Sequence, residues 1–98
     1  MNDCKFLGRV VNKTFQLDDN DKEKVTLTLA VENKRKTKYD SSKKVDVENL
    51  IFEAWGSAAL VLFSNLDTGG QLLIINSTAR KSFDGGVVFR INEFKIIT

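Results

Sequence analysis

The chain has 98 residues, which is enough for one domain, and Leu, Ile, Val and Phe form about a third of it, enough apolar material for a folded core. The absence of histidine and the presence of only one cysteine remove imidazole bases, the usual zinc ligand sets and any intrachain disulfide. We therefore expect no catalytic residues, no metal site and no cofactor. No apolar run resembles a targeting segment or approaches a membrane span, so we expect a cytoplasmic protein without a membrane partner.

The net charge of +2 is unevenly distributed along the chain. Asp18 to Lys24 sums to −2, whereas Lys34 to Lys44 sums to +5. The bases of this second segment are Lys34, Arg35, Lys36, Lys38, Lys43 and Lys44. We expect these residues to form a basic loop that can track a polyanion; the alternative interpretation is a hairpin loop whose charges are simply solvated.

The first half of the chain has the residue pattern of three β-strands. No proline interrupts it, and its many β-branched residues suit a pleated sheet. The first strand is expected from about Cys4 to Leu17, with Gly8 as a site where the strand bends or bulges. A strand that bends favours a closed barrel.

The second and third strands show an alternation of apolar and polar residues. In the second strand, residues 24–32, the inward side chains are Val25, Leu27, Leu29 and Val31, and the outward ones are Thr26, Thr28 and Ala30. In the third, residues 45–55, the inward side chains are Leu50, Phe52 and Ala54, and the outward ones are Asn49, Ile51, Glu53 and Trp55.

The second half of the chain predicts a short helix followed by two strands. Ser57 can cap a helix whose apolar residues recur at helical spacing, and Gly69-Gly70 can end it. Two strands, 71–83 and 87–97, flank a tight turn at Asp84-Gly85-Gly86. The resulting order, β-β-β-α-β-β, predicts a single all-β domain over residues 1–98: a five-stranded Greek-key barrel with the oligonucleotide/oligosaccharide-binding (OB) fold, whose second and third strands present a ligand face.

Trp55 is the most informative single residue. A large aromatic side chain on the outward face can stack a nucleobase, at about 1 to 3 kcal/mol per base without reading sequence. The alternative is that Trp55 plugs the end of the barrel or lies in a subunit contact, and the parity of the strand does not separate the two.

Phe83 lies beside the predicted hairpin turn, directly after Arg80, Lys81 and Ser82. Two cations next to an aromatic ring are suited to phosphate contact and base stacking. The alternative role for Phe83 is a cross-strand pair with Val87 or Val88 that stabilises the hairpin. Tyr39 in the basic segment could stack a base in the same way, or could simply be exposed.

The carboxylates Asp46, Glu48 and Glu53 are poor candidates for an enzyme or metal site. Strand alternation places Glu53 on the opposite face from the other two, and no histidine accompanies them. We therefore expect a binding protein, and a small carboxylate-only enzyme is a remote third hypothesis.

Four segments resemble the bacterial and phage single-stranded DNA-binding protein family. They are Lys5-Phe-Leu-Gly-Arg-Val10, Val25-Thr-Leu-Thr-Leu-Ala30, Phe52-Glu-Ala-Trp-Gly56, and Leu66 to Ile74. Their order and spacing match the family across nearly the whole chain. The resemblance implies a barrel that binds single strands without sequence preference and assembles as a homodimer or homotetramer, often through the edge of the first strand.

The resemblance also assigns roles to particular residues. It places Trp55 and Phe83 at stacking positions and Thr28 on the exposed face of the second strand, where Thr26 and Asn49 complete a polar binding face. It places Arg9, Arg80 and Lys81 along the nucleic-acid path. Apolar residues alone do not locate a subunit interface, although one small barrel does not obviously need all of Phe6, Phe89, Phe94, Ile96 and Ile97.

Some features depart from the family pattern. After the second strand, where the family often has an aromatic residue, this chain has the charged segment Asn33 to Lys36. Glu53 on the binding face would repel a phosphate. The sequence reaches Thr98 without the flexible tail and acidic terminal peptide that recruit replication and repair enzymes in the family. We therefore expect either part of a longer chain or a short divergent member of the kind that mobile elements and phages carry, and no tail-mediated recruitment.

The sequence thus predicts non-enzymatic binding and protection of single-stranded DNA in replication, recombination or repair. RNA is not distinguished from DNA as the ligand. The alternative function is a protein-interaction module on the same barrel, such as a primosome-like or recombination accessory subunit, with weak or no nucleic-acid binding.

Overall fold

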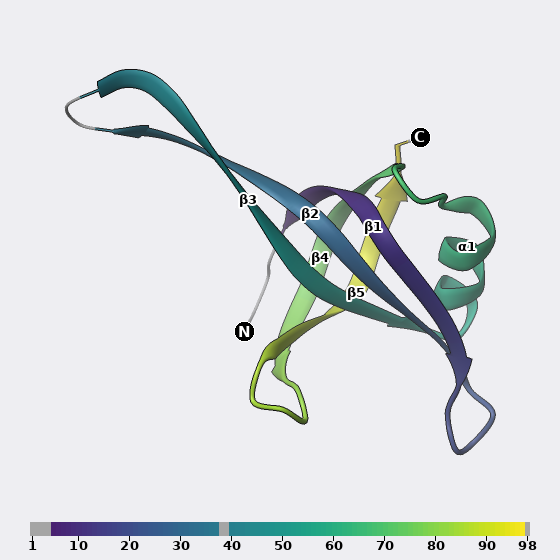
Figure 1. Cartoon of the computed structure of the whole chain (residues 1–98). Helices are drawn as coiled ribbons and strands as arrows, with labels where there is room; N and C mark the ends of the chain where they lie inside the picture. The colour runs from purple at the N-terminus through teal and green to yellow at the C-terminus, as the bar shows by residue number, and fades with distance from the viewer. Residues whose placement is uncertain (1–4, 38–39, 98) are drawn as a thin grey trace.

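Five strands and one helix follow one another in the order that the sequence predicts (Figure 1). The computed structural model describes the backbone of residues 5–37 and 40–97 and the side chains of residues 5–32 and 47–97. The elements are β1 (Phe6–Leu17), β2 (Glu23–Thr37), β3 (Asp40–Trp55), α1 (Ser57–Asn65), β4 (Gln71–Lys81) and β5 (Val87–Ile96).

The five strands form a closed barrel in the spatial order β1-β2-β3-β5-β4. Closure depends on β1, which pairs with β2 on one edge and with β4 on the other. All pairs are antiparallel except β3 and β5, which run parallel where Ile51, Phe52 and Glu53 meet β5. This arrangement confirms the predicted OB-fold barrel.

The core forms where the predicted alternation places it. Val25, Leu27 and Leu29 of β2 are fully buried, as are Phe52 and Ala54 of β3. Removing a large apolar side chain from water stabilises a fold by about 1.5 to 3 kcal/mol. The core therefore fixes which face of β2 and β3 remains available outside.

Phe6 and Phe89, two of the apolar residues that one small barrel does not obviously need, pack against this core. Phe6 packs edge-on against Phe52 with ring centroids 5.2 Å apart, and against Phe89 at 4.8 Å. Phe94 and Ile96 are also partly buried against the core. The barrel therefore uses these four residues at least in part, and Ile97 is the exposed one of the five.

Gly8 has a different role from the predicted bend. The bulge of β1 lies between Val10 and Asn12, whereas Gly8 pairs regularly with Val31. A Cβ atom at Gly8 would lie 3.0 Å from the backbone oxygen of Ala30 and 3.2 Å from the Cβ of Leu29. Glycine is therefore needed here because β1 and β2 approach too closely for a side chain.

We predict that Gly8→Ala lowers the free energy of unfolding by about 1 to 3 kcal/mol, because the added methyl group meets backbone and packed side chains that cannot move away. Gly86→Ala is the comparison variant and should cost less, since its Cβ would meet only side-chain atoms, Asp84 Oδ1 at 3.3 Å and Ser82 Oγ at 3.4 Å, and no backbone. Urea unfolding followed by circular dichroism measures both. Equal stabilities of the two variants would contradict the packing role of Gly8.

Helix α1 begins and ends differently from the prediction. Ser57 is the first helical residue and makes no capping hydrogen bond; the preceding Gly56, with φ of 65°, turns the chain from β3 into the helix. The helix ends at Asn65, before the predicted Gly69-Gly70 terminus, because Leu66 adopts an extended backbone and its side chain is fully buried.

Within the described ranges, no helix has the length and apolarity needed to traverse a bilayer.

Lys13 of β1 holds the C-terminal end of this helix. Its Nζ atom donates hydrogen bonds to the carbonyl oxygens of Phe63 and Leu66, each at 2.8 Å, and lies 4.8 Å from the centroid of the Phe63 ring. A cation here satisfies terminal carbonyls and the negative end of the helix dipole. No basic residue within the last turn of the helix supplies this contact.

We predict that Lys13→Met destabilises the fold by about 1 kcal/mol, because the thioether keeps the apolar stem but cannot donate to the two carbonyls. Lys22→Met removes an equal charge from an exposed turn residue and should change stability much less. Thermal unfolding of the two variants tests this. A loss of stability that is the same for both would assign the effect to net charge alone.

The strands β2 and β3 continue well beyond the barrel as a two-stranded arm, defined here as residues 32–37 and 40–48 (Figure 1). The sequence predicts a basic loop over Lys34 to Lys44, but cross-strand pairing continues through Lys36 opposite Lys43. The prediction of a loop is wrong because backbone hydrogen bonds between the strands persist after the apolar alternation stops. The molecule consequently extends 54 Å along its longest axis, against 30 and 22 Å across it.

Candidate nucleic-acid interface

Several predicted site residues share the outer surface of four neighbouring strands. Side chains directly opposite each other in adjacent strands point to the same face. One cross-strand row consists of Thr28, Ile51, Val88 and Arg80. The next consists of Thr26, Glu53, Arg90 and Thr78. We call the surface formed by these two rows, together with Lys24 and Trp55 at its end, the outer face.

Trp55 is the last residue of β3 and lies opposite Lys24 of β2. Its side chain is half-buried and lies outside the apolar core cluster. The Nζ atom of Lys24 is 5.1 Å from the centroid of the Trp55 ring, within range of a cation–π interaction. The indole is thus held in place by a cation, and a base that stacks on it would do so beside a positive charge.

Glu53 is buried on this outer face, although strand alternation predicts an outward side chain. Only 2% of it is exposed, because the Nε and Nη2 atoms of Arg80 both donate to its carboxylate, the latter at 2.8 Å. The Nζ atom of Lys24 lies 3.4 Å from Oε2 of the same carboxylate. The hydrogen bonds from Arg80 hold the pKa of Glu53 below its ordinary value even though burial opposes this, and Glu53 in turn raises the pKa of Arg80. Repulsion of a phosphate by Glu53 is therefore not expected, since two cations compensate its charge.

Arg80 reaches Glu53 by crossing a strand. Arg80 belongs to β4 and Glu53 to β3, and β5 lies between them in the sheet. Its guanidinium therefore lies over β5, where Val88 is only 9% exposed. The Nη1 atom also donates to the carbonyl oxygen of Lys81 at 3.3 Å. The side chain of Arg80 nevertheless remains 46% exposed, so its outer edge is open to solvent.

The lowered pKa of Glu53 makes stability depend on pH. A carboxylate whose pKa is lower in the folded state stabilises that state above its ordinary pKa, here 4.5, and this contribution is lost as the pH falls through the folded-state value. We therefore predict that acidification from about pH 7 to about pH 3 destabilises the natural chain more than Glu53→Gln, which has no such group to protonate. Urea unfolding at both pH values measures the difference. Asp84, whose pKa is also lowered, is present in both proteins. Parallel pH profiles would contradict the prediction.

Phe83 projects from the β4–β5 turn into solvent. Its relative exposure is 111%, so it does not pack against Val87 or Val88, and the cross-strand alternative is excluded. The turn is fixed around it: the amide of Ser82 donates to the carbonyl of Gly86 at 2.8 Å, and Asp84 accepts hydrogen bonds from the Ser82 hydroxyl and the Gly86 amide. These hydrogen bonds lower the pKa of Asp84. A rigid turn thus presents a free aromatic ring beside the exposed Lys81.

Arg9 lies on β1, the strand next to β2, in a further cross-strand row with the same strand parity as the two rows of the outer face. It is opposite Ala30, which is in turn opposite Asn49, so Arg9 and Asn49 flank one residue of β2. The Nη1 atom of Arg9 donates to the carbonyl oxygen of Gly69 at 3.0 Å. Arg9 is therefore tied to the loop before β4.

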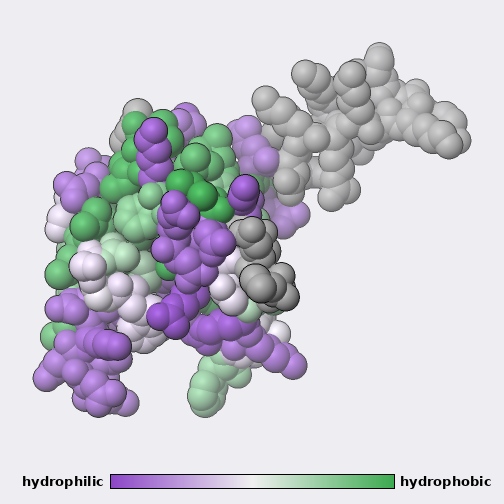
Figure 2. Space-filling view, turned by 180° about the vertical axis from the view of Figure 1, so that it is seen from behind, coloured by the Kyte–Doolittle hydropathy of each residue, from purple (hydrophilic) through white to green (hydrophobic). Residues whose placement is uncertain are grey.

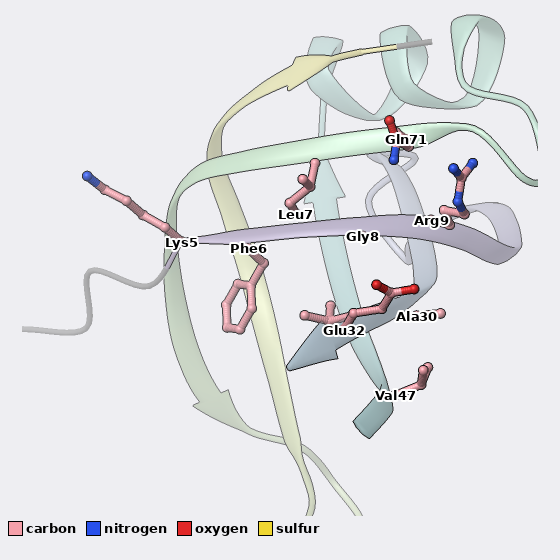
Figure 3. Close-up of a pocket in the computed structure, with 10 residues that line it drawn as sticks. Lys5, Phe6, Leu7, Gly8, Arg9, Ala30, Glu32, Val47 and Gln71 are labelled. Atoms are coloured by element: carbon pink, nitrogen blue, oxygen red, sulfur yellow. The ribbon is translucent and has the colours of Figure 1, made fainter. Parts of the chain in front are cut away.

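A hollow of about 660 Å³ opens beside Arg9, at the fork where β1 separates from the arm (Figure 3). In this view β1 runs between Gln71 on one side and Glu32 and Val47 on the other, and Lys5 points away from them. The hollow exposes apolar side chains, since Leu7 is 52% and Val47 58% exposed. Neither Trp55 nor Phe83 lines it.

Other predicted residues fall where side chains are not described. Lys38 and Tyr39 lie outside the described residues altogether. For the other bases of the segment only the backbone is described, and it belongs to the arm: Lys34, Arg35, Lys36, Lys43 and Lys44. Their contribution stays a prediction based on the +5 charge of this segment.

The carboxylates do not form a cluster in the part of the chain that the structure describes. Glu48 is exposed, whereas Glu53 is engaged by Arg80 and Lys24. No group of three His, Cys, Asp or Glu residues that could hold a metal ion occurs among the described residues.

Sequence reasoning missed two cations of the outer face, Lys24 and Arg90. Lys24 alternates with the buried residues of β2 in the same way as Thr26 and Thr28, so the sequence pattern places its side chain on their face of the strand. Its position opposite Trp55 depends on the strand register, which the β2–β3 alternation alone does not give. Arg90 is exposed and lies opposite Glu53 through the parallel β3–β5 pair, a contact between distant segments that carries no local signal.

Comparison with known proteins links this geometry to a group of solved structures. No protein-family model matches the sequence, and no curated protein matches it either. The protein PriB from Ralstonia solanacearum has a TM-score of 0.79 at 13% identity, covering 100% of this chain and 99% of that chain. The second single-stranded DNA-binding protein (SSBb) from Mycobacterium smegmatis has a TM-score of 0.76 at 14% identity, covering 98% and 88%. The chain shares the fold of these proteins.

A small single-stranded DNA-binding protein from Streptomyces coelicolor is similar in the same way, with a TM-score of 0.68 at 16% identity, covering 98% of this chain and 94% of that chain. The likeness in each case spans the whole barrel. The resemblance in fold that the sequence segments indicated is therefore confirmed at the level of architecture.

Proposed function

We propose that this protein binds single-stranded DNA without enzymatic activity and without sequence preference, and so protects it during replication, recombination or repair. The observation that carries the proposal is the exposed ring of Phe83. A phenyl group that is fully exposed on a hydrogen-bonded turn contributes no packing to the fold, and the exposed Lys81 lies two residues before it in the sequence. The names of two proteins of the same fold, from Mycobacterium smegmatis and Streptomyces coelicolor, state single-stranded DNA binding, which supports this assignment.

In the proposed mechanism, bases stack on aromatic rings while cations neutralise the phosphates. Trp55 and Phe83 would each take a base, and Tyr39 a further one. Lys81, Arg9 and the bases of the arm would contact the backbone, and Arg80 would contribute through its exposed edge. Thr26, Thr28 and Asn49 would supply polar contacts on the face. Binding of this kind is sensitive to salt and tolerant of sequence.

Assembly belongs to the same proposal. A single barrel covers few nucleotides, and linking copies increases avidity without new contacts. We propose a homodimer or homotetramer acting in the cytoplasm, with single-stranded DNA as the ligand and RNA as the competitor to be tested alongside it.

We predict that Trp55 fluorescence is quenched by oligo-dT at low salt, since Trp55 is the single tryptophan of the chain and reports stacking directly. Phe83→Ala should weaken binding by a factor of about 5 to 150, the equivalent of about 1 to 3 kcal/mol for one stacked base. Fluorescence titration measures both. Because Phe83 packs against nothing, the variant should fold normally.

Phe63→Ala is the matched control. Phe63 is also an exposed aromatic residue, but it lies on helix α1 and packs against Phe15 with centroids 5.1 Å apart. Its replacement should leave the affinity for oligo-dT unchanged. An absence of both quenching and binding at low salt would refute the proposed function.

A protein-interaction module is the second candidate function. Figure 2 shows apolar side chains gathered over the upper and left parts of the barrel in the view from behind. Helix α1 exposes Leu60, Val61 and Phe63 by 40% or more each. Apolar groups exposed together favour contact with another protein. This function would require that Trp55→Ala leaves oligonucleotide affinity unchanged while abolishing a partner contact or the oligomer.

A further inference from the structure

Among the residues whose side chains the structure describes, Glu53 is the one buried carboxylate. The proposed binding function does not use it. It is 2% exposed, yet it lies in the outer face between Thr26 and Arg90, in the path proposed for nucleic acid. A buried charge is costly unless it is paired and hydrogen-bonded. Its partners, Arg80 and Lys24, are themselves cations of the outer face.

The carboxylate offers Arg80 the same chemistry as a phosphate. Two guanidinium N–H groups donate to its two oxygens, in the bidentate geometry that arginine uses for carboxylates and phosphates alike. The Lys24 ammonium, 3.4 Å away, is placed between this carboxylate and the Trp55 ring. Glu53 therefore occupies donors that a nucleic-acid backbone would otherwise receive.

A phosphate is poorly placed to displace Glu53. If Arg80 moved to a phosphate, the carboxylate would stay buried with Lys24 alone, which leaves part of its desolvation cost uncompensated. The lowered pKa of Glu53 agrees with a carboxylate that stays charged and paired. Only the outer edge of Arg80 remains for a ligand.

We propose that Glu53 is an internal counterion that competes with the phosphates of single-stranded DNA for Arg80 and Lys24, and thereby sets the affinity and the salt dependence of the outer face. This inference rests on the proposed function. Glu53 is then a positioning residue, which acts on the ligand only through Arg80 and Lys24. The cations paired with Glu53 then contribute little to counterion release, most of which comes from cations elsewhere.

The decisive variant is Glu53→Gln, which keeps the size of the side chain and removes the charge. Each phosphate contact on a single strand makes the slope of log Kobs against log salt more negative by about 0.7. Releasing Arg80, Lys24 or both should therefore steepen the slope for oligo-dT by about 0.7 to 1.4 and tighten binding at low salt. Adding Arg80→Gln to Glu53→Gln should reverse about 0.7 of this change.

Glu48→Gln is the matched control, because it removes an equal charge from the same strand at an exposed position. Its slope should stay close to that of the natural chain. A Glu53→Gln slope that is unchanged, shallower or equal to that of Glu48→Gln would overturn the proposal.

A second measurement uses the natural chain and does not depend on the folding of a variant. The Nε–Hε NMR signal of Arg80 should keep its position when oligo-dT saturates the protein, because this group remains bonded to Glu53. A change in this signal that shows the Arg80 Nε–H group bonded to a phosphate in place of Glu53 would overturn the proposal.

The failure of the proposed function can be told apart from the failure of this inference. If the natural chain binds oligo-dT but Glu53→Gln behaves like Glu48→Gln, only the counterion role is refuted. If the natural chain does not bind at low salt, the proposed function is refuted, and binding gained by Glu53→Gln would still support the counterion. If neither protein binds, both are refuted.

Discussion

The close approach of β1 to β2 at Gly8 is the constraint on which the rest of the barrel depends. At this residue β1 pairs with Val31 of β2 and with Leu72 of β4, so one position joins the two ends of the sheet. A Cβ atom at Gly8 would meet atoms of Ala30, Leu29 and Val31 at 3.0 to 3.2 Å, so β1 lies against β2 with little room for a side chain. Closure at this point buries the inner residues of β2 and β3, and it leaves their outer residues as a continuous surface with β5 and β4.

Local pattern predicts most of the fold but not the contacts between distant segments. The alternation of Val25, Leu27 and Leu29 identified the core face, because burial of alternate side chains is a property of one strand. The ion pairs of Glu53 were missed, because Arg80 reaches it from β4 across β5. The C-terminal end of the helix was mispredicted for a similar reason: burial of Leu66 and capping by Lys13 are tertiary contacts that override the local signal of Gly69.

Glu53 and Phe83 contradict the usual relation between polarity and burial in opposite directions. A charged side chain is enclosed in the outer face, while an aromatic ring is left in water. Each is held by a specific local arrangement, two cations in the first case and a hydrogen-bonded turn in the second. Neither arrangement improves packing: the first holds a charge in the outer face, and the second presents an aromatic ring at the β4–β5 turn.

The arm has a consequence for the behaviour of many copies together. Beyond Val31, β2 has no β1 partner in the described register, and β3 pairs with β5 only at residues 51–53, so the arm presents strand edges. Such edges are templates for pairing with another chain, and like charge is a common protection. The segment 34–44 carries a +5 charge, which disfavours edge-to-edge pairing of two such arms. If single-stranded DNA binds this segment as proposed, it would neutralise the same charge, and the repulsion between neighbouring arms would then fall with occupancy of the strand.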